Sequence, residues 1–308
     1  GAYLINAAGA MERLTLFSNM VVFSSYAMQV IMSLMMLVMI FILLPRAMVS
    51  AKRINEVLDT TPTIVQGNVT QGQPNLAGEV SFSHVTFRYP GASEDVLHDV
   101  SFTAHKGETV AFIGSTGSGK STVVNLVPRF YDATSGDVFV DGVNVKDYVQ
   151  DSHNNKIGYV PQKAVLFKGT VADNIGYGDN GQGAPTQAAL ENAMRIAQGE
   201  DFVEKMDDKY QSDIAQSGTK LSGGQKQRIS IARAVYRKPE IYIFDDSFSA
   251  LDYKTDRLLR TALREETAGV TSLIVAQRIG TIMNADQIIV LDEGRVVGTG
   301  KHRELLKT

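Results

Sequence analysis

The chain has 308 residues, of which 44% are hydrophobic, and its formal net charge at pH 7 is -3. This length and composition fit one ordinary globular domain together with an apolar segment. The net charge gives no electrostatic reason to expect nucleic acid as a partner. The sequence contains no cysteine, which excludes disulfide frameworks and cysteine-based metal sites.

An uncharged segment runs from Leu14 to Pro45 near the start of the chain. It exceeds the roughly 20 residues that a helix needs to cross a bilayer, so about 17–44 is predicted to be a transmembrane helix rather than a cleaved signal peptide. Basic residues follow at once, which predicts that the C-terminal side faces the cytoplasm. Residues 1–10 are expected to end a preceding membrane helix, so the chain is predicted to be part of a longer protein with further membrane helices.

Three parts are predicted along the chain. Residues 1–58 form the C-terminal part of a transmembrane domain, with a helical cytoplasmic extension after the membrane, and residues 59–77, rich in polar, proline and glycine residues, form a linker. Residues 78–308 form a second domain, with an antiparallel β subdomain at its start and a helical subdomain at about 165–234. Interleaved apolar strands predict a mainly parallel α/β core; they lie near Val110, Ile157, Ile241, Ser272 and Ile288.

A glycine-rich loop follows the predicted strand that begins at Val110. It satisfies the G-x-x-x-x-G-K-[ST] pattern without a mismatch and consists of Gly114, Ser115, Thr116, Gly117, Ser118, Gly119, Lys120 and Ser121. Backbone N–H groups of such a loop point at phosphate oxygens, Lys120 reaches the β- and γ-phosphates, and the Ser121 hydroxyl binds Mg²⁺. The alternative, a glycine- and serine-rich turn that binds nothing, does not account for the strand before the loop and the predicted helix after it.

Two aspartates, Asp245 and Asp246, end the apolar strand that begins at Ile241. A P-loop enzyme holds its Mg²⁺ with a carboxylate at the end of such a strand, so Asp245 is predicted on the metal side. The alternative is a pair of solvated acids in a loop.

About a hundred residues after the phosphate loop lies the sequence Leu221, Ser222, Gly223, Gly224 and Gln225, before a predicted helix at 229–235. Without context these residues could be a helix N-cap after a turn. Together, this sequence and the phosphate loop indicate a single ATPase architecture, which neither motif indicates alone.

With these motifs, the chain resembles half of an ATP-binding cassette (ABC) exporter, of which it would cover the last membrane helix and nearly all of the nucleotide-binding domain. The resemblance implies a P-loop NTPase fold with a RecA-like α/β core. It assigns Tyr89 to adenine stacking, Thr122 to the nucleotide site, Gln162 to sensing Mg²⁺ and the membrane domain, and Asp252, in Ser249–Asp252, to the loop that crosses the dimer seam.

The same resemblance implies ATP and Mg²⁺ as ligands and a second half-transporter as partner. The signature residues Ser222, Gly223, Gly224 and Gln225 would complete the ATP site of the opposite subunit. A single copy of the domain is therefore expected to be half of two sites.

Two positions depart from the family pattern. Most members have Glu where this chain has Asp246, and His where it has Gln277. The Asp246 side chain is one methylene shorter than that of Glu, so its carboxylate is retracted by roughly an ångström. Misplacement of a catalytic group on that scale can cost about a hundredfold in rate. Gln277 can hydrogen-bond a phosphate oxygen but cannot carry a proton as histidine can.

These departures predict a site that binds ATP and cleaves it slowly, as in the degenerate half of heterodimeric bacterial exporters. The expected protein is an integral protein of a bacterial plasma membrane with a cytoplasmic ATPase domain, and it would drive export of drugs, lipids or peptides. A homodimer with an active Asp246 site, an ABC-type ATPase that acts on DNA or the ribosome, and a nucleotide-gated clamp without transport remain the alternatives.

Overall fold

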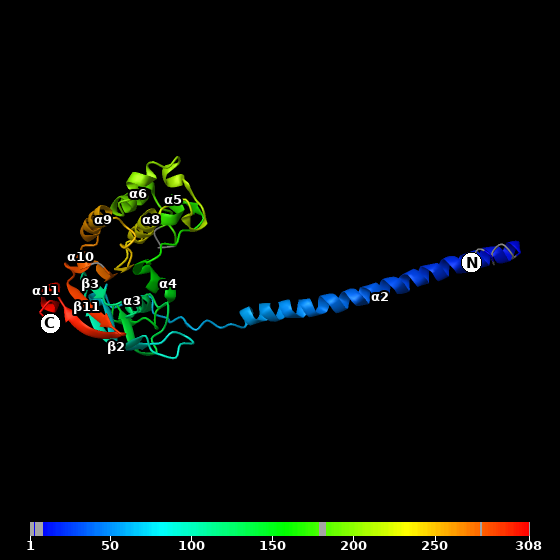
Figure 1. Ribbon diagram of the computed structural model, residues 1–308, viewed down its shortest axis with the longest axis horizontal. Coiled ribbons are helices and arrows are strands. Elements are labelled where there is room, and N and C mark those ends of the chain that lie inside the picture. Colours follow the sequence, from blue (N-terminus) through cyan, green and yellow to red (C-terminus); the bar gives the residue numbers. More distant parts are fainter. Residues whose placement is uncertain (1–2, 4–8, 179–182, 278, 308) are drawn as a thin grey trace. The chain divides into compact units, whose positions relative to one another are not determined.

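The computed structural model describes residues 3, 9–178, 183–277 and 279–307. Its contacts divide the chain into two compact units, Gly1–Thr63 and Ile64–Thr308 (Figure 1). The predicted end of a preceding helix at residues 1–10 lies largely outside the described residues.

The first unit contains one long helix, α2 (Ala10–Leu58), which continues through Pro45. The predicted membrane span at 17–44 and the predicted helical extension both lie inside it. Most of its large apolar side chains are exposed, and in the part of the chain that the structure describes it is the one helix long and apolar enough to cross a membrane by length and composition.

The second unit is built on a mainly parallel sheet. Its strands run in the order β12–β11–β3–β10–β9–β6 among the described residues, and all neighbours except β11 and β12 are parallel. The bounds are β3 (Thr109–Ile113), β6 (Ile157–Val160), β9 (Ile241–Asp245), β10 (Thr271–Val275), β11 (Gln287–Asp292) and β12 (Arg295–Gly300). Each of the five predicted core strands is found in this sheet, and the α/β prediction is confirmed.

A second, antiparallel sheet lies beside it, in the order β2–β1–β4–β5. Its strands are β1 (Val80–Phe87), β2 (Leu97–Ala104), β4 (Ser135–Val140) and β5 (Val143–Asn144). Phe102 joins the two sheets, because its ring stacks on Phe82 at 4.6 Å and meets the edge of Phe112 of β3 at 5.3 Å. The antiparallel β subdomain that the alternating residues predicted is therefore present.

A helical lobe contains α8 (Gly223–Tyr236). In Figure 1 it is the group of helices that contains α5, α6, α8 and α9, beside the sheets. It consists of α5 (Val171–Ile175), α6 (Gln187–Ile196), α7 (Glu200–Val203), α8 and the short strands β7 (Gly169–Thr170) and β8 (Asp213–Ile214), with α9 (Tyr253–Glu266) packed against α6. Buried apolar side chains of these elements form one core with β6 and β9.

The second half of the predicted linker is bound to the cassette. The backbone N–H of Gly67 donates to the backbone carbonyl of Tyr148 at 3.0 Å, and that of Gln73 donates to the backbone carbonyl of Asp141 at 2.8 Å. Residues 64–77 therefore belong to the second unit by their contacts. The remaining elements are η1 (Pro74–Leu76), α3 (Lys120–Leu126), α4 (Gln150–Asn155), η2 (Lys209–Gln211), η3 (Gln216–Gly218), α10 (Ile279–Ile282) and α11 (His302–Leu305).

Candidate functional site

The carboxyl ends of four neighbouring parallel strands gather most of the predicted site residues. The glycine-rich loop follows β3, Asp245 ends β9 and Asp246 comes next, Gln277 follows β10, and Gln162 follows β6. Since these strands are adjacent and parallel, their ends meet at one edge of the sheet, which is where ligands bind in open α/β folds.

The glycine-rich loop requires glycine for steric reasons at two positions. A Cβ at Gly114 would overlap the backbone carbonyl of Leu291 in β11. Gly119, the N-cap of α3, has a φ of 93°, and a Cβ there would lie 2.7 Å from Cδ2 of Leu97. These constraints fix the path of the loop, which also contains Ser115, Thr116, Gly117 and Ser118.

Lys120 lies under this loop and is only 9% exposed. Its Nζ donates to the carbonyl oxygens of Gly114 at 3.0 Å and Ser115 at 2.6 Å, and to Oγ of Ser118 at 3.3 Å. Burial lowers the pKa of Lys120, and the charges of nearby Asp246 and Asp245 oppose that shift. All three hydrogen-bond acceptors are uncharged, so the ammonium group is suited to an anionic ligand such as phosphate.

The Ser121 hydroxyl donates to Oδ1 of Asp245 at 2.7 Å, and the hydroxyl of Tyr159 in β6 lies 3.5 Å from the other carboxylate oxygen. Burial raises the pKa of Asp245 and the neighbouring Asp246 adds to the shift, while the Ser121 hydrogen bond opposes it. Among the described residues there is no cluster of three histidine or acidic side chains able to hold a metal. One carboxylate beside one hydroxyl fits Mg²⁺, which commonly takes its other ligands from water and substrate phosphates.

Asp246 is held by two glutamine amides. Its Oδ2 accepts from Nε2 of Gln277 at 2.9 Å and from Nε2 of Gln162 at 3.2 Å. Asp246 is 7% exposed and has a φ of 46°, a left-handed conformation that aspartate adopts more readily than most residues. Its N–H donates to the carbonyl of Val275 in β10 at 3.0 Å, which holds the backbone of Asp246 against β10.

Tyr89 lies beside the first turn of α3, where its hydroxyl and that of Thr122 are 3.0 Å apart. The rings of Phe87 and Tyr131 pack edge-on against Tyr89, with centroids 4.8 and 5.1 Å away. The two residues predicted to bind the nucleotide are thus brought together, and the stacking of Tyr89 on adenine stays a prediction.

The predicted signature forms the start of α8. Ser222 is the N-cap: its Oγ accepts from the N–H of Gln225 at 3.2 Å, and its own N–H donates to Oε1 of Gln225 at 2.8 Å. The N-cap interpretation and the signature interpretation therefore describe the same residues. Ser222 and Gly223 are exposed, so a second molecule could reach them.

Asp252 is the N-cap of α9 and accepts from the N–H of Thr255 at 3.0 Å. The loop before it abuts the signature, since a Cβ on Gly224 would lie 3.4 Å from the carbonyl oxygen of Ala250. Within the described part of the chain, no hydrogen bond joins residues 222–225 or Asp252 to the glycine-rich loop.

Tyr159 was not among the residues predicted from the sequence, and its hydroxyl donates to Oδ1 of Asn125 in α3 at 2.9 Å. Burial raises its pKa, and the charge of Asp245 adds to the shift. A tyrosine in an apolar strand, three positions before Gln162, was the available signal. Its partner Asn125 has no comparable signal, because it is a polar residue within a short helix.

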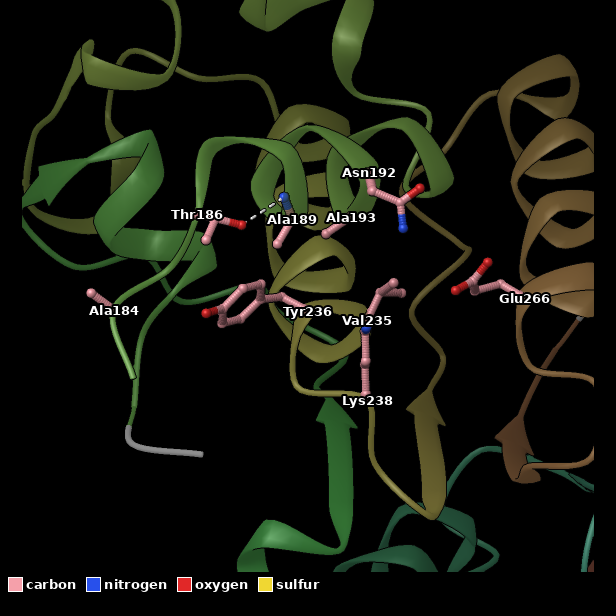
Figure 2. Close-up of a pocket in the computed structure, with 9 residues that line it drawn as sticks. All are labelled: Ala184, Thr186, Ala189, Asn192, Ala193, Val235, Tyr236, Lys238 and Glu266. Atoms are coloured by element: carbon pink, nitrogen blue, oxygen red, sulfur yellow. Dashed lines mark hydrogen bonds between the residues drawn. The ribbon is translucent and has the colours of Figure 1, made fainter. Parts of the chain in front are cut away.

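A separate pocket lies between α6 and the ends of α8 and α9 (Figure 2). Its lining includes Asn192, Tyr236, Lys238 and Glu266. It contains none of the predicted nucleotide-site residues, so the chemistry described above lies elsewhere.

Comparisons with known proteins agree with this geometry. Residues 97–249 match the family model described as ABC transporter. An uncharacterized ABC transporter ATP-binding protein of Mycobacterium tuberculosis is 45% identical over 94% of this chain and 49% of its own length. A Staphylococcus aureus protein is 43% identical over 74% of this chain and 39% of its own length. Its name describes it provisionally as a multidrug export ATP-binding/permease protein.

The structure of a bacterial Atm1-family ABC exporter with ATP bound is also similar, with a TM-score of 0.78 and 33% identity over 85% of this chain and 45% of that one. The chain spans about half the length of the curated relatives it matches. The matched motif region, the relatives and the shared fold lead to one conclusion: the chain belongs to the ABC transporter family and carries its ATP-binding domain.

Proposed function

We propose that this chain is the ATP-binding and energy-coupling part of one half of an ABC exporter. The proposal is supported by the length and apolar composition of α2, by the relative named for multidrug export, and by the fold shared with an exporter. In this proposal α2 is a membrane helix of a bacterial plasma membrane, the cassette is cytoplasmic, and the cargo is a drug, a lipid or a peptide.

ATP would bind with its phosphates at the glycine-rich loop and Lys120 and with its adenine against Tyr89. Ser121, Asp245 and Gln162 would hold Mg²⁺, which neutralises phosphate charge when it is bound. Lys120 supports this assignment, because it is a buried cation whose hydrogen-bond acceptors among the described residues are all uncharged.

The partner would be a second half-transporter. Exposed Ser222 and Gly223 at the start of α8 offer backbone N–H groups to a phosphate held by another cassette, and the macrodipole of this 14-residue helix favours an anion there. ATP binding would then close two cassettes head to tail, and hydrolysis would separate them again.

The observation that carries the finer proposal is the environment of Asp246. In the ATPase reaction the carboxylate at this position would orient the water that attacks the γ-phosphate. Here it has the short aspartate side chain, and one of its oxygens already accepts hydrogen bonds from Gln162 and Gln277. The reach of the carboxylate and its free acceptor capacity are both reduced, and Gln277 cannot exchange a proton. The site is therefore proposed to bind ATP and hydrolyse it slowly.

A slow site implies a partner whose own site hydrolyses ATP. The functional unit is proposed to be a heterodimer in which the partner's catalytic residues meet the signature of this chain. Copurification of the full-length protein from native membranes tests this point, and recovery of self-associated chains only would contradict it.

The decisive experiment measures ATP turnover by the full-length protein purified alone, beside its Asp246→Glu/Gln277→His double variant. A slow wild type and a variant faster by about a hundredfold are expected. Brisk and equal turnover in both would overturn the slow-site proposal in favour of a homodimer with an active Asp246.

Membrane fractionation tests the exporter proposal. Recovery of the protein in the soluble fraction would overturn that proposal and favour a non-transport ATPase.

A further inference from the structure

Arg260 of α9 makes a forked ion pair with Asp256, one helical turn earlier. Its Nε donates to Oδ1 of Asp256 at 3.0 Å, and its Nη2 donates to Oδ2 at 2.9 Å. The Asp256 side chain is 2% exposed and that of Arg260 is 25% exposed. A bidentate pair with a buried carboxylate holds the guanidinium plane in one orientation.

The third nitrogen of the same guanidinium leaves α9. Nη1 of Arg260 donates to the backbone carbonyl oxygen of Gly280 at 2.5 Å. Gly280 lies in α10, three positions after Gln277. One side chain therefore connects α9 to the segment that carries a residue of the ATP site.

The segment with Gln277 is held at both ends. Before it, the N–H of Ala276 donates to the carbonyl of Phe112 in β3 at 3.3 Å. After it, Arg260 holds Gly280. Between these anchors, Gln277 is exposed, and its amide reaches Asp246 at 2.9 Å. Further along α10, Ile282 is 3% exposed and packs in a core with Ala111 and Ala276, so the Arg260 contact holds the backbone between Gln277 and that buried residue.

We infer that Arg260 is a positioning residue: by holding Gly280, it keeps the amide of Gln277 at the carboxylate of Asp246. The inference rests on the role that the proposed function gives to Gln277. Arg260 itself does not touch the reacting atoms, and it acts through the backbone of another element. An i, i+4 ion pair that served only α9 would need two of its nitrogens and would leave Gly280 unbound.

The experiment compares variants of the full-length protein. Arg260→Ala removes both contacts, and Arg260→Lys keeps a positive charge opposite buried Asp256 but has one nitrogen instead of a fork. Arg257→Ala is the matched control, because it removes an exposed arginine from the same helix. Amide hydrogen exchange is read in peptides that contain Gln277 and Gly280, and ATP turnover is read in the wild-type and Gln277→Ala backgrounds.

Exchange in those peptides should become about tenfold faster in both Arg260 variants and stay unchanged in Arg257→Ala, because a hydrogen bond from a charged donor is lost. Turnover by Arg260→Ala should rise on the order of tenfold in kcat with little change in KM, because the amide of Gln277 is no longer held at Oδ2 of Asp246. In the Gln277→Ala background the same substitution should change kcat by less than about twofold, since residues that act through one another are not additive.

Unchanged exchange in Arg260→Ala, wild-type exchange and turnover in Arg260→Lys, or equal changes of kcat in both backgrounds would each overturn this inference alone. Wild-type kcat in Gln277→Ala would overturn the proposed role of Gln277, and this inference with it. The exchange measurement separates the two cases, because it does not depend on hydrolysis.

Discussion

The hydroxyl of Ser121 donates a 2.7 Å hydrogen bond to Oδ1 of Asp245, a residue 124 positions further along the chain. The bond joins the first turn of α3 to the end of β9. Asp245 is 5% exposed, and burial raises its pKa, so each hydrogen bond that stabilises its ionised form affects both the fold and the site.

Replacement of Ser121 by alanine should remove a donor from this buried carboxylate. We expect the free energy of unfolding to fall by about 1–3 kcal/mol, because a buried acceptor loses a partner. We also expect ATP with Mg²⁺ to stabilise the variant less than the wild type. Urea unfolding with and without the ligands measures both effects, and Ser121→Thr, which keeps the hydroxyl, is the control. Wild-type stabilisation of Ser121→Ala by Mg²⁺ and ATP would contradict the metal assignment.

Ser222 has two separable roles, as N-cap of α8 and as a proposed contact to the partner's ATP. Aspartate and asparagine are both good N-caps, so Ser222→Asp and Ser222→Asn should keep the free energy of unfolding within about 0.5 kcal/mol. Aspartate alone adds a negative charge where a phosphate would dock. ATP turnover of the assembled transporter should therefore be lost in Ser222→Asp and largely kept in Ser222→Asn. Equal turnover in both variants would argue against a phosphate at this position.

Lys156 and Asp141 form a buried ion pair of 2.7 Å, with side chains 15% and 1% exposed. Asp141 also accepts from the N–H of Gly78 at 2.6 Å, which ties the backbone just before β1 to the end of β4. Lys156→Met should lower the free energy of unfolding by about 3–5 kcal/mol, because it leaves a buried charge without its partner.

The double variant Asp141→Asn/Lys156→Met is the control for that prediction. It removes both charges and should recover part of the loss in the same denaturant experiment. A double variant less stable than Lys156→Met would show that the charge of Asp141 is stabilised by other groups.

His153 should make stability depend on pH. Its ring is fully buried and stacks on Tyr148, and its Nε2 donates to the carbonyl of Val127 at 2.7 Å. Burial lowers the pKa of His153, which means that the unfolded chain binds the proton first as the pH falls. The contribution of His153 to the free energy of unfolding should then be constant above a pH of about 6.5. Below that pH it should decrease by at most about 1.4 kcal/mol per pH unit.

His153→Gln keeps a donor for Val127 and cannot titrate in this range. Unfolding measured at several pH values between about 7 and 5 should therefore give a flatter profile for this variant. Identical slopes for wild type and variant would show that other groups cause the loss of stability.

Short-range patterns in the sequence were enough for the elements and motifs. The α/β class, the strands that begin near Val110 and Ile241, and the long apolar helix follow from hydrophobic periodicity and run length, which depend on neighbouring residues only. The loop around Lys120 was recognisable because its chemistry requires contiguous residues. The linker was predicted from composition, and composition did not show that residues 64–77 hydrogen-bond to the cassette.

What only the tertiary structure decided are the contacts between residues far apart in sequence. Gln162 and Gln277 meet on one oxygen of Asp246 because β6, β9 and β10 are parallel neighbours whose carboxyl ends coincide. Arg260 reaches Gly280 for the same kind of reason, since α9 and α10 are brought together by the packing around the sheet. The sequence alone predicted which residues bind a nucleotide. Strand order and register determined which of them touch, because hydrogen bonds depend on distances that no local pattern contains.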